Sequence, residues 1–575
     1  MRSRLKLALV GAAAVACVGL VLRRAPPPIR GGPLLVDDPR TLLALEGRGL
    51  SFARVVGKDG LSVIQKAVAD DMAELTKDAP ADSPRRPFRP EWLTRGSFEL
   101  VGVVNRIDRR VFDAATCGEV RLVYRLALKA KKRPTTRLPM TVNVRIPQPK
   151  PRGGDCRAVA ERWLSTPDVA GLVSELPRPA KIEINFQSIH VPATQVDMDD
   201  NAEYVLRAFD LDARGLVQGH LFNTPRTDLD ANGRAKLLAW VESHVSEIDE
   251  GTAVVPDELL ATRITSVSPR GLVHPANRPF SQLVGDARTA FGRLALAGRT
   301  RARTPELLLR RLDELTCVGC HQTRGIAGFH LLGEERDANA TFNALAVGHS
   351  PHLGADLGWR ALDLASVARS ERAPVRPFAA FPDGAEGAEC GLVEGLADWT
   401  CSNGLVCRDI HHDSWGICAR KEGGTHPGDP CEDVDVTPAS RLLGAVVRGH
   451  GPDPTCPAPN GAATKGAFCA PNWLGFTGGM CSETCSKPGA VEGGSICAPL
   501  PSAGYEADCF LSREPIEQCL DRHFAFARVA RCDATTPCRD DYGCARVAGA
   551  PPGTGGCVPP YFIFQARVDG PVLDR

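Results

Sequence analysis

Between residues 98 and 222 the chain repeatedly alternates apolar and polar side chains with a period of two. The segment GEVRLVYRLAL (118–128) places Val120, Leu122 and Tyr124 on one face and Arg121 on the other. A two-residue period is typical of a β-strand with one buried face. We therefore predict six strands, over 98–104, 118–128, 139–146, 181–188, 202–209 and 217–222.

One buried face per strand predicts an antiparallel sheet that is covered on one side only. The opposite face carries polar side chains, namely Arg121, Arg125, Asn143, Arg145, Asn185 and Gln187. We expect this polar face to be exposed to solvent, and a ligand-binding surface is the alternative. Helical patterns at 60–75, 156–165 and 233–245 accompany the strands, so the predicted fold is α+β, with a β-rich N-terminal domain.

The segment TDLDANGRAKLLAWVE (227–242) has acidic and amide residues at the offsets of a calcium-binding loop. Its twelfth position, where such a loop needs a bidentate acid, is Ala239. We therefore predict a turn and a helix N-cap here rather than a calcium site.

The 21 cysteines divide the chain into regions. Cys117 and Cys156 are the only cysteines of the α+β domain (40–300), so we expect them to form one disulfide. A helical segment (301–380) follows. The remainder (388–575) holds 16 cysteines in loosely recurring gaps among many Gly, Pro and Asp residues. It is predicted to form small modules that disulfides stabilise in place of a hydrophobic core.

The first 30 residues are predicted to be an export signal followed by a linker. Three basic residues within the first six precede an apolar run over 7–22 that is short for a bilayer span. Ala14-Val15-Ala16 followed by Cys17 resembles a bacterial lipoprotein signal, which implies a lipid on Cys17. An uncleaved N-terminal anchor is the alternative. Either reading places the protein in the periplasm, at the outer membrane or on the cell surface, where this density of cysteines would form disulfides.

The overall charge favours neither nucleic acid nor an anionic membrane as a partner. Lys and Arg number 69 against 68 Asp and Glu, which leaves a formal charge of +1.

The most specific chemical pattern is CVGCH, in which Cys317, Cys320 and His321 fall within five positions. Two thiols one helical turn apart can both bond the vinyl groups of a haem, and the imidazole that follows can bind the iron. A helical pattern leads into the motif, with Thr304 as the expected N-cap and Pro305 in the first turn.

This motif resembles the haem-attachment site of c-type cytochromes, and the segment 301–380 would be the cytochrome c-like part. The resemblance implies a covalent haem c on Cys317 and Cys320, with His321 as the proximal iron ligand. Many c-type cytochromes use a methionine as the distal ligand, but only Met480 follows the motif here. His330 is our candidate distal ligand. The other possibilities are His349, His352 and an open iron face.

Two other uses of the motif stay open. The two cysteines could form a disulfide, or they could bind another metal together with His321. We therefore expect an exported c-type cytochrome-like protein with one haem, which transfers electrons to an unidentified redox partner protein or senses a small ligand. The alternative is a cell-surface binding or structural protein whose CVGCH motif is only a disulfide. The sequence leaves open whether the protein is an enzyme.

Overall fold

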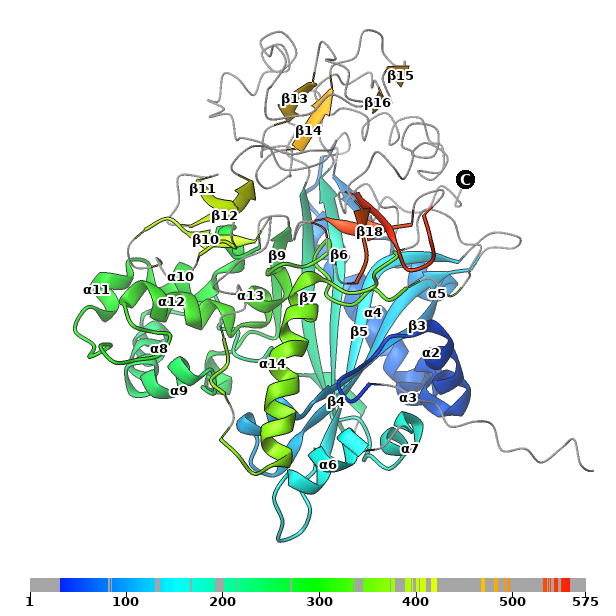
Figure 1. The fold of residues 1–575 in the computed structure, drawn as a ribbon, viewed down its shortest axis with the longest axis horizontal. Coiled ribbons are helices and arrows are strands. Elements are labelled where there is room, and N and C mark those ends of the chain that lie inside the picture. Colours follow the sequence, from blue (N-terminus) through cyan, green and yellow to red (C-terminus); the bar gives the residue numbers. More distant parts are fainter. Residues whose placement is uncertain are drawn as a thin grey trace, which may run out of the picture.

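The structure is a computed structural model (Figure 1). It describes residues 32–420 apart from short gaps, four short strands between 467 and 496, and residues 531–558 apart from short gaps. The fold is α+β, as predicted. The expected export signal, including Cys17, lies outside the described residues. Within the described part, no helix combines the length and the apolar character that a membrane crossing requires.

The centre of the fold is a nine-stranded antiparallel sheet of order β1-β3-β4-β5-β6-β7-β8, in which β2 also pairs with β6 and β9 with β7. Each of the six predicted strands overlaps one of the strands β3 to β8, and three strands were not predicted. The strands are β1 (Leu35–Val36), β2 (Arg86–Pro87), β3 (Ser97–Arg106), β4 (Thr116–Leu128), β5 (Thr136–Pro149), β6 (Lys181–Val191), β7 (Asn201–Asp212), β8 (Gly215–Gln218) and β9 (Arg263–Ser268).

The three predicted helices correspond to α4, α6 and α8. The described helices are α2 (Pro39–Leu45), α3 (Phe52–Val55), α4 (Gly57–Thr76), α5 (Trp92–Arg95), α6 (Arg157–Ser165), α7 (Val169–Ser174), α8 (Ala231–Ser243), α9 (Val245–Glu250), α10 (Pro279–Val284), α11 (Ala287–Phe291), α12 (Pro305–Glu314), α13 (Cys317–Gln322) and α14 (Pro351–Ala368).

The apolar face of the sheet forms the main hydrophobic core. Val120, Leu122 and Tyr124 of β4 are fully buried there, as their alternation predicts. They belong to one cluster with residues of α2, α3, α4, α6 and α7. Removing this much apolar surface from water is the dominant favourable contribution to folding.

The prediction that the opposite sheet face is exposed to solvent was wrong. Arg125 is only 1% exposed and Gln187 is fully buried. The loop 326–332 and α14 cover this face (Figure 1). Polar residues can be buried here because backbone carbonyls of the loop accept their hydrogen bonds: Arg125 donates to Leu332, and Asn185 donates to Gly328 over 2.8 Å.

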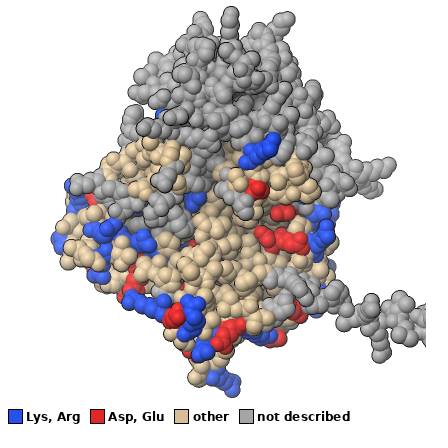
Figure 2. All heavy atoms as spheres, viewed as in Figure 1, with Lys and Arg blue, Asp and Glu red and all other residues tan. Residues whose placement is uncertain are grey.

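The helices α8 to α12 pack around a separate hydrophobic cluster beside the sheet. The predicted N-cap in the calcium-like segment is confirmed. The Asp230 carboxylate accepts the Gly233 N–H over 2.7 Å at the start of α8. On the face shown in Figure 2, basic and acidic side chains are intermixed around a broad area of uncharged residues.

The predicted disulfide between Cys117 and Cys156 is present and joins the start of β4 to the start of α6. Among the described residues of the C-terminal region, four further disulfides lie in or beside two small sheets. The first sheet contains β10 (Glu389–Gly391), β11 (Leu405–Asp409) and β12 (Trp415–Arg420), and the second contains β17 (Arg531–Cys532), β18 (Gly543–Ala545) and β19 (Gly555–Val558). Five disulfides indicate an oxidising compartment outside the cytoplasm.

These two modules share one pairing pattern, because the first cysteine of each bonds the third and the second bonds the fourth. The pairs are Cys390–Cys407, Cys401–Cys418, Cys532–Cys544 and Cys538–Cys557. The loose recurrence of cysteine gaps thus reflects a repeated unit. The pairs β13 (Ala467–Ala470) with β14 (Met480–Glu483), and β15 (Val491–Glu492) with β16 (Ser495–Ile496), lie between them in the chain.

Removing the first disulfide should destabilise the sheet domain. A cross-link that closes a 39-residue separation restricts the unfolded chain, so C117S/C156S should lose about 4 kcal/mol of unfolding free energy. Urea unfolding followed by tryptophan fluorescence measures this loss. The control C401S/C418S removes a disulfide of the C-terminal region and should leave that transition in place. An unchanged midpoint in C117S/C156S would contradict the prediction.

Candidate functional site

The CVGCH motif forms a short helix of its own, α13, rather than the end of the preceding helix. As predicted, α12 begins with Thr304 as its cap, but it ends at Glu314. Thr316 then starts α13, because its hydroxyl oxygen accepts the Gly319 N–H over 2.8 Å. The motif cysteines therefore lie in the first turn of a new helix.

Close packing explains the glycine within the motif. A Cβ atom on Gly319 would overlap the carbonyl oxygen of Asp313 at the end of α12. The Thr316 hydroxyl donates to that same carbonyl over 2.7 Å. Any larger residue at 319 would push α13 away from α12 and displace both thiols.

Among the cysteines whose side chains the structure describes, only Cys317 and Cys320 carry free thiols. Both are half-buried, and they have different neighbours. The Cys317 thiol donates to the Phe222 carbonyl oxygen over 3.4 Å, whereas the Cys320 sulfur lies 3.6 Å from Nε2 of His352.

These different surroundings give the two thiols different pKa values. Burial raises the pKa of Cys317 to about 11. Burial also opposes ionisation of Cys320, but the charge and hydrogen bond of His352 outweigh it and lower the Cys320 pKa to about 7. Burial lowers the pKa of His352 as well, and the direct contact between the two groups couples their titration.

Three imidazoles gather next to these thiols. The His321 and His330 rings are 5.9 Å apart between centroids, and the His330 and His352 rings are 4.5 Å apart. Nδ1 of His321 and Nδ1 of His352 are buried and have no hydrogen-bond partner in the described structure. Burial lowers the pKa of His321 to about 3 and that of His330 to about 4, so both rings are neutral near pH 7.

His330, our candidate distal ligand, thus lies beside His321. Both of its ring nitrogens are hydrogen-bonded: Nε2 donates to the Cys320 carbonyl and Nδ1 accepts from Ser350, each over 2.8 Å. His352 belongs to the cluster, whereas His349 pairs with Asp37 at 3.4 Å.

A different subset of these residues matches a metal site. One ligand atom each from Cys320, His330 and His352 lies within 4.8 Å of the others. His321 is not part of this group. One thiolate and two imidazoles form a donor set that suits zinc or another late transition metal.

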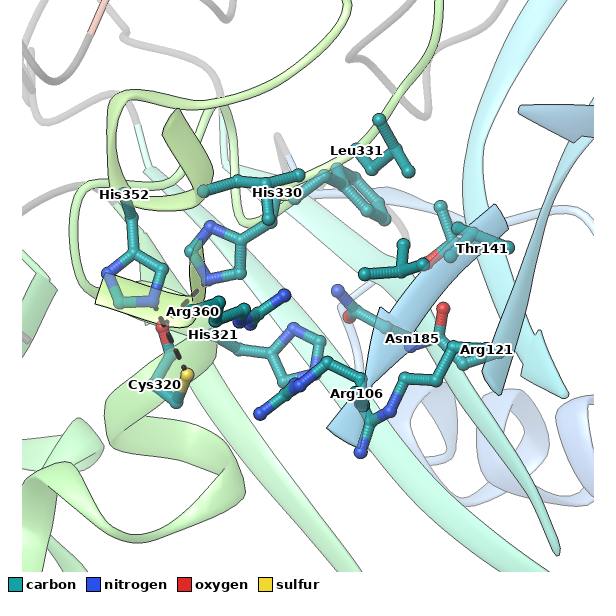
Figure 3. Close-up of a pocket in the computed structure, with 15 residues that line it drawn as sticks. Arg106, Arg121, Thr141, Asn185, Cys320, His321, His330, Leu331, His352 and Arg360 are labelled. Carbon is teal, nitrogen blue, oxygen red and sulfur yellow. Dashed lines mark hydrogen bonds between the residues drawn. The ribbon is translucent and has the colours of Figure 1, made fainter. Parts of the chain in front are cut away.

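A cavity of about 110 Å³ opens between this cluster and the polar face of the sheet (Figure 3). Cys320, His321, His330 and His352 line one side. The arginines around it are Arg106, Arg121 and Arg360, and Asn185 contributes an amide whose oxygen is buried and unpartnered within the described part of the chain.

These arginines belong to two buried networks. In the first network, Asp108 pairs with Arg106 at 2.8 Å and with Arg376 at 3.4 Å, and Asp356 pairs with Arg376 at 3.3 Å and with Arg360. Although burial raises the pKa of Asp108, Arg106 outweighs it and holds this pKa well below its ordinary value.

The second network lies on the polar face of the sheet. Glu119 accepts from Arg121 and Arg145 over 2.7 Å each, and Arg109 lies 3.3 Å from the same carboxylate. Glu183 pairs with Arg145 at 3.1 Å and with Arg121 at 3.4 Å. Arg121 and Arg145 belong to the polar face that the alternation of side chains predicts. Arg106 and Arg360 were missed because they come from a strand end and from a helix distant in sequence.

No protein family model, curated protein or solved structure matches this chain.

The difference in thiol acidity predicts selective alkylation. In protein produced without a cofactor, iodoacetamide should modify Cys320 with a midpoint near pH 7, whereas Cys317 should react appreciably only above about pH 10. Replacing His352 with Gln removes the stabilising partner, so the Cys320 midpoint should rise to pH 9 or above. Peptide mass spectrometry resolves the two positions.

The control for this experiment is His349→Gln, which alters a histidine paired with Asp37 and should leave both midpoints unchanged. Equal rates for the two cysteines across the pH range would contradict the assigned environments.

Proposed function

We propose that the protein is an exported c-type cytochrome-like protein that carries one haem on Cys317 and Cys320, with His321 as the proximal iron ligand. The observation that carries the proposal is the state of these cysteines. The ten other cysteines whose side chains the structure describes are all paired, whereas the two thiols of CVGCH stay free. Unpaired thiols in an oxidising compartment need another use, and covalent attachment of haem is one.

The donor set fits the group. His321 is held directly after Cys320 on α13, and its buried Nδ1 has no partner within the described structure. The enclosed cavity of about 110 Å³ is smaller than a porphyrin, so binding requires the covering loop 326–332 to move outward. Arg324 lies just before this loop and Ala327 lies within it. Their φ angles are 51° and 46°, and such positive values store backbone strain in residues other than glycine.

A bound haem would supply one-electron redox chemistry or an axial position for a small ligand. The chain would contribute the neutral imidazole of His321 and the apolar side chain of Leu353 on α14. His330 remains the candidate distal ligand, and it would have to release either the Cys320 carbonyl or Ser350 to bind iron.

Export to the periplasm, the outer membrane or the cell surface is part of this proposal, as is attachment through a Cys17 lipid or an N-terminal anchor. The disulfides support an oxidising compartment. An unidentified redox partner protein would exchange electrons with the haem.

The proposal predicts covalent haem in protein made together with a cytochrome c maturation system. Denatured protein should keep its peroxidase stain on a gel, and its intact mass should include one haem. C317A/C320A should lose the stain completely, because both thioether bonds are gone. His349→Ala should retain it, because that residue lies outside the cluster of thiols and rings.

Circular dichroism would show whether each variant is folded. A folded wild-type protein without added mass, or with Cys317 bonded to Cys320, would refute haem attachment. The second of these results would favour the surface-protein alternative.

A metal centre of Cys320, His330 and His352 is the second candidate, and it is favoured by the convergence of their ligand atoms within 4.8 Å. It differs from haem attachment in one testable respect, because it uses Cys320 and does not need Cys317 or His321. His330 would again have to exchange a hydrogen bond for the metal.

Metal analysis of protein produced without haem separates the two candidates. If the metal centre exists, wild-type protein and C317A should each hold about one equivalent of zinc, and C320A and H352A should hold none. The opposite dependence, with zinc retained in C320A, would exclude this centre.

A further inference from the structure

The cavity beside the thiols is lined by cations and lacks any acid. Among the 15 residues that line it, three are arginines and none is Asp or Glu. Figure 3 shows Arg106, Arg121 and Arg360 around a shared space, with Asn185 on the side of the sheet. Such a lining attracts negative charge.

The networks behind the lining do not neutralise it. Three arginines of the first network share two carboxylates, which leaves one positive charge uncompensated; they are Arg106, Arg360 and Arg376 with Asp108 and Asp356. The second network repeats this ratio, with Arg109, Arg121 and Arg145 sharing Glu119 and Glu183. Within the described residues, the two networks therefore carry an excess of two positive charges.

Arg360 gives the clearest indication that an anionic ligand would complete the charge and hydrogen-bond pairing of this cavity. It is 6% exposed, and its Nη2 pairs with Asp356. Its Nε and Nη1 are buried without a partner in the described structure. A guanidinium has five N–H donors, and leaving buried donors unsatisfied is costly. Burial and the neighbouring Arg106 lower the Arg360 pKa to about 10, which fits a cation whose charge Asp356 compensates only in part.

We infer that this cavity is an anion-binding site in which the free edge of Arg360, together with Arg106 and Arg121, holds a group of two negative charges. A volume of about 110 Å³ admits a tetrahedral oxyanion such as sulfate or phosphate. The unpartnered Asn185 oxygen would accept a hydrogen bond from a water bound beside the ligand.

The inference does not depend on haem attachment. The same carboxylate or oxyanion chemistry could come from a free anion or from the two propionates of a haem bonded at Cys317 and Cys320. These two sources differ in whether a free anion still binds when haem is attached.

The test is calorimetric titration of the full chain with sulfate, compared with chloride at equal ionic strength. The haem-free C317S/C320S protein should bind about one sulfate and show no comparable signal with chloride. Arg360→Gln in that protein should weaken sulfate binding at least about tenfold, because it removes the charge and two donors. The matched control Arg369→Gln changes an exposed arginine that follows α14 and should bind sulfate like the parent.

Two results would overturn the inference: wild-type affinity in the Arg360 variant, or no preference for sulfate over chloride in the parent. If Arg360→Gln does not fold, a selenate soak of C317S/C320S crystals replaces it. The anomalous peak should lie within hydrogen-bonding distance of Arg360, and an empty cavity would refute the site. Comparison with haem-loaded protein identifies the source: loss of sulfate binding there points to propionates, and retained binding points to a free anion.

Discussion

The fold depends on a constraint that is unusual for an antiparallel sheet, since ionised side chains are buried on one of its faces and must be paired there. Although burial raises the pKa of Glu119, Arg145 and Arg121 outweigh it and keep the carboxylate ionised. A buried charge that loses its partner destabilises a protein far more than an exposed one does. Arg121 of β4 lies opposite Arg145 of β5, and both donate to Glu119. Ion pairs therefore stabilise this strand register together with the apolar core on the other face.

The same constraint positions the thiols and imidazoles. The loop 326–332 satisfies sheet residues with its carbonyls, as Leu332 does for Arg125 and Gly328 for Asn185. The Cys320 carbonyl then accepts from His330. A C-terminal module fixes the following segment, because the Ala346 N–H donates to the Cys544 carbonyl over 2.8 Å shortly before α14 begins. Sheet, motif helix and disulfide module are thus joined by hydrogen bonds around the segment that carries His330 and His352.

The parts that could be predicted from sequence are those governed by local periodicity and local chemistry. The alternation of Val120, Leu122 and Tyr124 predicts both the strand and its buried face, and the isolation of Cys117 and Cys156 predicts their bond. The burial of Arg125 could not be predicted, because its hydrogen-bond partner, the Leu332 carbonyl, is distant in sequence. Without a known partner, a charged side chain is predicted to be exposed. The cavity could not be predicted for the same reason. Its arginines come from β3, β4 and α14, and only the folded chain brings them next to His321.

The state of the two motif thiols follows from this packing. In an oxidising compartment, cysteines three residues apart would be expected to oxidise to a disulfide, yet each thiol here is directed to a different neighbour. The N-cap at Thr316 and the close contact of Gly319 with Asp313 fix the helix that carries them. Within that helix, Cys317 donates to Phe222 while Cys320 faces His352. Cys317 is protonated near pH 7 and is therefore a poor nucleophile, and Cys320 would have to leave His352 to approach it. The fold thereby holds the two sulfurs against different neighbours, and it makes Cys320 the more acidic and more reactive of the two.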